Sequence, residues 1–496
     1  MVDLPHEIWL HIAHFIPASV LEGLISVNST FYDIAMDCRY RQISFAFLDH
    51  RMLRNIVRLK DPVVARRVRV LHAYPVFLKQ FLDREQDSLL GRQSLRLRLT
   101  AFASQILEQK KSTRRNNFRR VQKFRTAADV VHALLDVFSG LPNVTDYHIM
   151  WSGLQAVPVS PVSFLAAIFK PNLRKLALDI SLENVVKLLP PTCTPFNVEE
   201  LDLIIRIDHF APVSDRVLIM INHLAPAVAR LKATLRKLVI QVWEPLDFSP
   251  LFLAIDRLPL LTHLTLGIPI EAPHLGDPYG LTKFLNRQSS TLRSLSFRAT
   301  QYSGPGLTPD SMSIDDWVSC ALADVHITHL RSLDISSSLF PFTASLSCLL
   351  QFSATITSLV LTGCYHTLAD VANILDAFRC RPRNERLETL RLGSVALTPQ
   401  LLDLLARELP NLYRLELLVR EVTAHSDEYL PACDGVHGPP ESQIDYFFCE
   451  MEKRRYPQWH LRRLKILLTS FPYRFPYGPH VEQLLAVCVP TIRGFS

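Results

Sequence analysis

The chain has 496 residues, of which 48% are hydrophobic and 20% are charged, a balance that excludes a highly charged disordered polymer and supports a buried core along most of the sequence. Glycine is scarce, with 15 residues, which disfavours the glycine-rich turns that nucleotide-binding folds use to hold phosphates. The formal net charge of +7 arises in one segment, because residues 108–125 hold eight basic side chains and one acidic side chain.

The first predicted element is a short helix that opens at Pro5, a residue that fits only the first turn of a helix. Asp3, just ahead of it, can accept hydrogen bonds from the unpaired amides of that turn. Ile8, Ile12 and Phe15 then fall on one helical face.

Two further short helices are predicted before residue 45. Ser19 and Glu22 have the spacing of a capping box for the second helix, and the third begins at Asn28 or Ser29. So small a unit cannot bury all of its apolar faces alone, which indicates a partner surface. The alternative is a helical cap that shields the end of a repeat array.

The N-terminal region resembles the F-box in its LPHEI opening, its apolar pair Leu21 and Leu24 and its VNSTF segment. We assign the F-box to residues 1–47, and the whole chain is similar to fungal F-box proteins with C-terminal leucine-rich repeats. Members of that family dock onto the Skp-type adaptor of a cullin-RING ubiquitin ligase, so the resemblance implies the adaptor and the cullin as partners. The adaptor contacts that it implies are Leu4, Pro5, Ile8, Ile12, Leu21, Leu24, Val27 and Phe31.

Residues 48–135 are predicted to form a helical, basic connecting region with a first strand near 68–73. The basic stretch at 108–125 fits an exposed helix face or a disordered insertion, and it also fits a nuclear-localisation or phosphate-binding patch.

Residues 136–496 carry a recurring LxxLxL pattern, in which alternate side chains of a short strand are buried, as in leucine-rich repeats. A weak copy ends at Ile149, and the clear copies are 25 to 49 residues apart, which leaves room for a helix after each strand. The ten clear copies occupy residues 173–178, 198–203, 235–240, 261–266, 292–297, 330–335, 356–361, 387–392, 412–417 and 461–466.

Helical spacing fills the segments between these strands, with Ser or Thr near the starts of 214–231, 367–378 and 398–410. Alternating strands and helices predict an α/β fold: a three-helix F-box followed by a leucine-rich-repeat solenoid with a parallel concave sheet and convex helices. The solenoid should be irregular, because most copies lack the Asn or Cys that usually follows the strand, and Cys364 supplies it once. A doubly wound α/β enzyme would instead need glycine-rich turns and continuous Val/Ile runs.

The alternate positions of each strand should face the concave side, where a partner binds. In the central strands these positions are mostly small, polar and close to neutral, which suits a protein partner and argues against nucleic acid. The predicted target-binding residues are His263, Thr265, Ser294, Ser296, Arg298, Ser332, Asp334, Ser358, Thr362 and Arg391.

Residues 424–459 interrupt the array with a Pro/Gly-rich excursion and a helix from about Glu441 to Arg455. This insertion fits either a contact loop or structural decoration.

No catalytic, metal-binding or nucleotide-binding motif stands out, so we expect no enzyme activity, no metal and no cofactor. The nine cysteines form no CxxC pair, and the sequence has neither a secretory signal pattern nor an apolar run long enough to span a membrane, which predicts the cytoplasm or the nucleus. The predicted function is substrate recognition within an SCF-type ubiquitin ligase. The alternative is an interaction scaffold that works without the ligase.

Overall fold

The computed structural model describes residues 5–47, 49–78, 127–151, 166–167, 169–188, 197–207, 213–302, 312–379, 387–423, 441–468 and 478–495. The chain divides into two compact units, Met1–Leu235 and Arg236–Ser496. Leu4 and the basic stretch at 108–125 lie outside the described residues. No helix in the described part of the chain is long and apolar enough to cross a membrane.

Unit 1 opens with a helical module of four short elements. They are α1 (His6–His14), α2 (Ala18–Leu21), the 3-10 helix η1 (Glu22–Leu24) and α3 (Ser29–Tyr40). The predicted start of the third helix is confirmed, because Asn28 caps α3 and its side-chain oxygen accepts a hydrogen bond from the amide of Phe31 at 2.8 Å.

The predicted capping box of the second helix is wrong. Ser19 lies inside α2, because the carbonyl of Pro17 already accepts hydrogen bonds from the amides of Val20 and Leu21. The helix therefore begins before Ser19, and a serine at that position cannot cap it.

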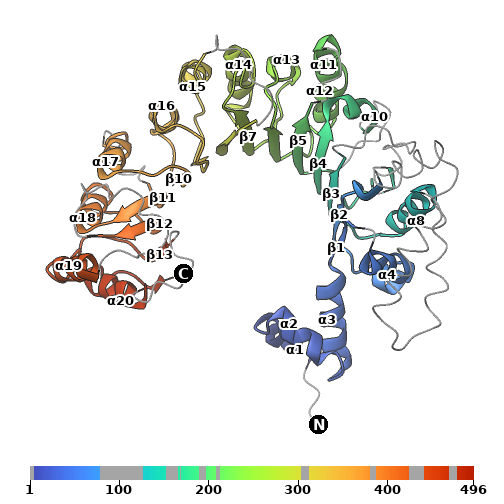
Figure 1. Ribbon diagram of the computed structural model, residues 1–496, viewed down its shortest axis with the longest axis horizontal. Coiled ribbons are helices and arrows are strands. Elements are labelled where there is room, and N and C mark those ends of the chain that lie inside the picture. The colour runs from blue at the N-terminus through green and yellow to red at the C-terminus, as the bar shows by residue number, and fades with distance from the viewer. Residues whose placement is uncertain are drawn as a thin grey trace, which may run out of the picture. The chain divides into compact units, whose positions relative to one another are not determined.

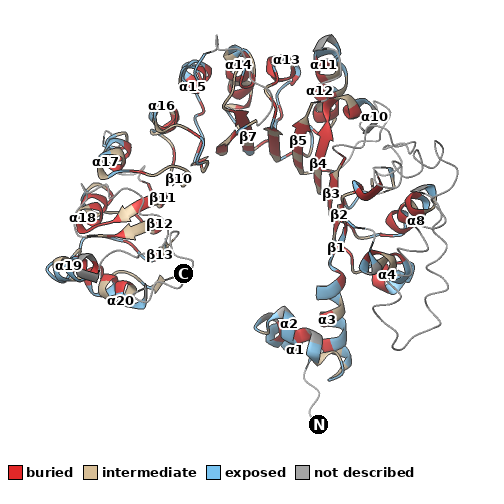
Figure 2. Ribbon diagram, viewed as in Figure 1, coloured by how far each residue is buried: buried red, intermediate tan, exposed pale blue. Residues whose placement is uncertain are grey.

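The module has a small core of its own, with Ala13, Leu21 and Phe31 at its centre. Trp9 packs edge-on against Phe31, with ring centroids 5.1 Å apart. Elsewhere the module is largely exposed, and Figure 2 shows α1 and α2 mostly in the exposed colour.

The rest of unit 1 alternates strands with helices. Its elements are β1 (Gln42–Phe45), α4 (His50–Arg58), α5 (Pro62–Ala65), β2 (Val70–Ala73), α8 (Ala127–Ser139), β3 (Asp146–Met150), β4 (Lys175–Ser181), η3 (Leu182–Asn184), α10 (Val185–Leu188), β5 (Glu200–Arg206), α11 (Val213–Ile219), the π-helical turn η4 (Met220–Leu224) and α12 (Ala225–Arg230). Strands β1 to β5 lie in chain order, and each printed pair is parallel.

The sheet begins earlier than the sequence predicts. We expected a first strand near residues 68–73, which is β2, but β1 pairs with it in register from Gln42 to Phe45. Only Ile43 and Phe45 of strand β1 are buried. The strand is therefore too short to show the LxxLxL pattern, which needs three buried positions. The boundary predicted at residue 47 therefore places the first strand of the sheet inside the segment that the sequence analysis assigned to an F-box.

Unit 2 continues the same alternation. Its elements are β6 (Lys237–Val242), α13 (Ser249–Ala254), β7 (His263–Pro269), α14 (Pro278–Gln288), β8 (Ser294–Thr300), α15 (Ile314–Leu322), β9 (Ser332–Ile335), α16 (Phe342–Phe352), β10 (Ser358–Leu361), α17 (Leu368–Asp376), β11 (Thr389–Leu397), α18 (Pro399–Glu408), β12 (Arg414–Val422), α19 (Glu441–Glu452), β13 (Arg463–Leu468), α20 (Gly478–Cys488) and β14 (Gly494–Phe495). Strands β6 to β14 also run parallel and in chain order. Within this unit the helices lie along one side of the strands (Figure 1).

The predicted fold class is confirmed. All ten clear LxxLxL copies become strands, β4 to β13, and their pattern leucines are buried. The three segments with helical spacing become α11–η4–α12, α17 and α18. Thr367 and Thr398 cap the last two, each accepting from a backbone amide three residues ahead.

Cys364 takes the position that the sequence predicts for it. Its thiol donates to the carbonyl of Phe340 at 2.8 Å and lies 3.8 Å from the carbonyl of Ser337, both in the preceding repeat. The side chain therefore ties two successive repeats together through their backbones, and burial raises the pKa of the thiol.

The predicted insertion at 424–459 needs a correction. Residues 424–440 lie outside the described residues, but the helix that follows, α19, packs against α18 and α20 as the helix of its own repeat. Phe447, Met451 and Trp459 are buried, and α19 also packs against β12. From Glu441 onward the segment is part of the array, and α19 ends at Glu452 rather than near Arg455.

Candidate functional site

Two aligned rows of side chains cross strands β7 to β11 of unit 2, because these parallel strands pair in one register. In β7, Leu264 and Leu266 are buried, whereas His263 is exposed and Thr265 is half-buried. The same alternation repeats in the next strands, so equivalent positions lie side by side at the strand spacing of about 4.8 Å. The first row joins His263, Ser294, Ser332, Ser358 and Thr389, and the second joins Thr265, Ser296, Asp334, Val360 and Arg391.

Eight of the ten predicted target-binding residues belong to these two rows. Arg298 lies two positions further along β8, and Thr362 directly follows the end of β10. His263 is exposed and most of the others are half-buried. Ser296 differs, because it is only 6% exposed and its hydroxyl lies within the surface. The structure therefore brings the predicted residues together, but it leaves Ser296 unable to offer much area to a partner.

A hydrogen-bonded network occupies the middle of this face. Arg298 donates through Nη2 to Asp334 Oδ2 at 2.7 Å and through Nη1 to the carbonyl of Ser336 at 3.1 Å. The hydroxyl of Ser336 donates to the other oxygen of Asp334 at 2.6 Å. Because these charges are already matched, the network shapes the surface more than it attracts a charged partner.

Unit 1 carries a group of rings that the predicted list omits. His72 on β2 stacks against His148 on β3 with ring centroids 4.5 Å apart, and it also stacks against Tyr74. The two nitrogens of His72 lie 2.9 Å from Gln42 Nε2 and 3.1 Å from the hydroxyl of Tyr74. His72 and His148 each occupy an alternate position of a weak repeat strand, at residues 68–73 and 144–149. The alternation of these strands in the sequence is therefore the signal that points to the pair.

Both imidazoles of this group resist protonation. Burial, together with the neighbouring His72 and Lys175, lowers the pKa of His148 to about 4, and Asp146 partly opposes this shift. Burial and Lys175 also lower the pKa of His72. The pair is therefore neutral near pH 7 and presents flat, uncharged rings on this part of the sheet.

The predicted adaptor-binding residues separate into two groups. Leu21 and Phe31 lie in the module's own core, and Leu24 packs against it. The second group is exposed and consists of Pro5, Ile8, Ile12 and Val27. Leu4 lies outside the described residues.

An apolar stripe runs along α1, formed by Ile8, Ile12 and Phe15, which are 45%, 36% and 73% exposed. The opposite side of the same helix supplies the core, because Ala13 is buried and Trp9 and Ile16 pack beside it. The helix therefore has two apolar faces, and the module covers only one of them.

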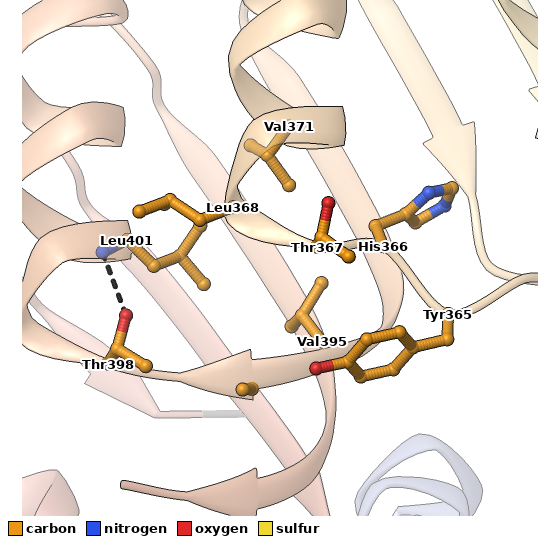
Figure 3. A pocket seen from close by; sticks show the side chains of 9 residues that line it. Tyr365, His366, Thr367, Leu368, Val371, Val395, Thr398 and Leu401 are labelled. Atoms are coloured by element: carbon orange, nitrogen blue, oxygen red, sulfur yellow. Dashed lines mark hydrogen bonds between the residues drawn. The ribbon is translucent and has the colours of Figure 1, made fainter. Parts of the chain in front are cut away.

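A small pocket lies where α17 and α18 meet β11 (Figure 3), with space of about 10 Å³, enough for a single water molecule. Among its lining residues only His366 and Tyr365 can titrate, and Figure 3 shows the His366 ring turned away from Thr398 and Leu401. Burial lowers the pKa of His366. The pocket therefore has no room for a substrate larger than water.

Within the described ranges, no three His, Cys, Asp or Glu side chains come together in a way that could hold a metal ion.

No protein-family model matches the chain, and no curated protein matches it by sequence. Among solved structures, the leucine-rich repeat-containing protein LegL7 from Legionella pneumophila is similar, with 15% identity and a TM-score of 0.35. That similarity covers 57% of this chain and 87% of the other. The fold is an α/β leucine-rich-repeat array. This assignment rests on the chain's own alternation of parallel strands and helices and on its buried LxxLxL leucines.

Proposed function

We propose that this chain is a substrate-recognition subunit of an SCF-type cullin-RING ubiquitin ligase. In this proposal the N-terminal module docks a Skp-type adaptor, which links the chain to a cullin, and the polar rows of the array bind a target protein. The chain itself performs no chemistry. The observation that carries the proposal is the apolar stripe on α1, exposed on a module whose other apolar face is already buried.

The stripe supports docking because its spacing is that of a helix laid against an apolar groove. Ile8, Ile12 and Phe15 stand at i, i+4 and i+7, the anchor positions of such contacts. Val27, which precedes α3, adds a further exposed apolar side chain. A soluble protein rarely leaves such side chains together on one helix unless a partner covers them.

The array supports the second half of the proposal. Its strands hold the two rows at fixed spacing on a rigid sheet, and most of the central positions are small hydroxyls. Such groups cost little to remove from water when a partner supplies hydrogen bonds. Repeat arrays use surfaces of this kind to bind proteins.

Adaptor co-purification tests the proposal, with a double substitution in the stripe as the perturbation. Ile8→Glu with Ile12→Glu places two charges on the stripe, and we expect the recovery of the Skp-type adaptor to fall at least tenfold. Leu10→Glu is the matched control, because Leu10 is 46% exposed on the same helix but lies about 200° around it from Ile8. The control should retain the adaptor.

If the double variant and the control recover the adaptor equally well, the stripe is not the docking surface. If the wild-type chain recovers no adaptor but still binds a target protein, the chain is an interaction scaffold that works without the ligase.

A further inference from the structure

A patch of positive charge lies on β11, β12 and β13 in unit 2. Its cations are Arg391, Arg414, Arg463 and Lys465, and they surround one acid, Glu416. In the register of the sheet, Arg414 stands beside Arg463, and Glu416 stands between Arg391 and Lys465. We call these five residues the cationic patch. Their net charge is 4 − 1 = +3.

Glu416 shows how the patch holds a carboxylate. It is 8% exposed, and its two oxygens lie 3.4 Å from Arg391 Nε and 3.8 Å from Arg414 Nη2. The side chains of Arg391 and Arg414 remain accessible to solvent, with exposed fractions of 40% and 43%. Each guanidinium has five N–H donors, so one carboxylate does not use their full capacity.

The other half of the patch has no such internal carboxylate. Arg463 is exposed and Lys465 is half-buried, and neither forms an ion pair or hydrogen bond with any side chain in the described residues. Strand β14, next to β13, contributes only Gly494 and Phe495. Arg463 and Lys465 therefore have no acidic partner among the described residues, and they lie beside a pair of arginines that already binds one carboxylate.

The neighbouring charges do not cancel the patch. Strand β12 also carries Arg420 and Glu421, whose charges offset each other, and Arg420 packs over the ring of Tyr365 at 5.7 Å. The net charge of the three strands thus stays at +3, from five basic and two acidic residues. The central network differs, because there Arg298 is matched by Asp334.

We propose that the cationic patch binds an acidic segment of the target protein, with Asp or Glu carboxylates bridging Arg414, Arg463 and Lys465 as Glu416 bridges Arg391 and Arg414. The proposal deepens the proposed target-binding role and rests on it. The spacing fits an extended segment, because alternate side chains of such a segment are about 6.7 Å apart, as are residues 463 and 465 of the strand. Carboxylates held by arginine forks form strong hydrogen bonds.

A direct binding measurement tests this. The probe is a fluorescein-labelled ten-residue peptide in which Glu alternates with Ser, titrated with the purified full chain at low and at moderate salt. Wild-type protein should bind it, and more weakly as salt screens the charges. A peptide with Gln in place of Glu should bind at least tenfold more weakly.

The decisive variant is Arg463→Glu with Lys465→Glu, which should weaken binding of the Glu peptide at least tenfold. Arg236→Glu with Arg293→Glu makes the same change in net charge at two exposed positions before β6 and β8, and it should change binding less than threefold. Both variants should melt close to the wild-type temperature, since Arg236, Arg293 and Arg463 are exposed and Lys465 is half-buried. Equal loss in the two variants, or equal binding of the Gln peptide, overturns the proposal.

Two further results identify a different occupant. Two alternative probes are a phosphoserine peptide without Glu and a single-stranded RNA of ten nucleotides. The acidic-segment proposal is wrong if either probe binds more tightly than the Glu peptide and loses binding in the Arg463→Glu, Lys465→Glu variant. Adaptor recovery, measured on the same protein, separates the two proposals. A chain that binds the adaptor but not the peptide refutes the patch alone, and a chain that binds the peptide but not the adaptor refutes the ligase role alone.

Discussion

Phe31→Ala should open the N-terminal module without changing the exposed apolar stripe on α1. Phe31 is only 4% exposed and lies with Ala13 and Leu21 in the small core, where the Trp9 ring meets it edge-on. Removing a buried phenylalanine typically costs about 3–5 kcal/mol, and the lost ring pair contributes about 0.5–1.5 kcal/mol of that. A unit of about 40 residues has little stability to spare.

Hydrogen exchange measures this opening directly. Since each 1.36 kcal/mol is a factor of ten in an equilibrium constant, a loss of about 3 kcal/mol should raise exchange of the α1 and α3 amides by about 100-fold. The amides of β6 to β14 in unit 2 should exchange as in the wild type. Adaptor recovery should fall too, because the stripe on α1 loses its support.

Val27→Ala is the control, because Val27 is 59% exposed and its truncation leaves the core intact. Its exchange rates should stay within threefold of the wild type. Wild-type protection of α1 in the Phe31→Ala protein would refute the reasoning, because the side chain would then carry no share of the module's stability.

Two other predictions concern the array. Gly393→Ala should destabilise unit 2 by about 1–3 kcal/mol, because the added Cβ would lie 2.3 Å from the backbone of Thr362. Gly23→Ala is the control and should leave the melting temperature unchanged, because nothing lies within 4 Å of its added Cβ. Equal melting temperatures of the two variants would count against the close packing at Gly393. Acidification should weaken the strands around His148, because its folded pKa of about 4 lies below the unfolded value of about 6.5. The unfolded state then binds more protons, so stability is complete above about pH 6.5 and declines towards pH 4. Hydrogen exchange of the β2 and β3 amides should therefore rise more on acidification in the wild type than in the His148→Gln protein. That variant keeps the neighbouring groups His72, Tyr74, Asp146 and Lys175. An identical rise in both proteins would exclude His148 as the cause.

The sequence by itself determined the repeated architecture. A strand that buries alternate side chains needs only local periodicity, so LxxLxL marks β4 to β13 without knowledge of the rest of the chain. Helix caps are local as well, and Asn28, Thr367 and Thr398 each begin a helix where their side chains predict one.

Tertiary structure decided which apolar face of α1 is covered. The sequence shows Ile8, Ile12 and Phe15 on one face, but it cannot say whether that face or the one with Trp9 and Ala13 enters the module's core. Packing against Leu21 and Phe31 settles the choice. The stripe is left exposed because three short helices enclose too little volume to bury both faces.

Register across strands decided the rest of the site. Glu416 is one acid among many in the sequence, and only the pairing of β11, β12 and β13 places it between Arg391 and Lys465. The stacking of His72 on His148 follows from pairing across residues that are far apart in the chain. Local patterns fix which side chains leave the core, but contacts between strands depend on the lengths of the segments that connect them, and those lengths vary from repeat to repeat.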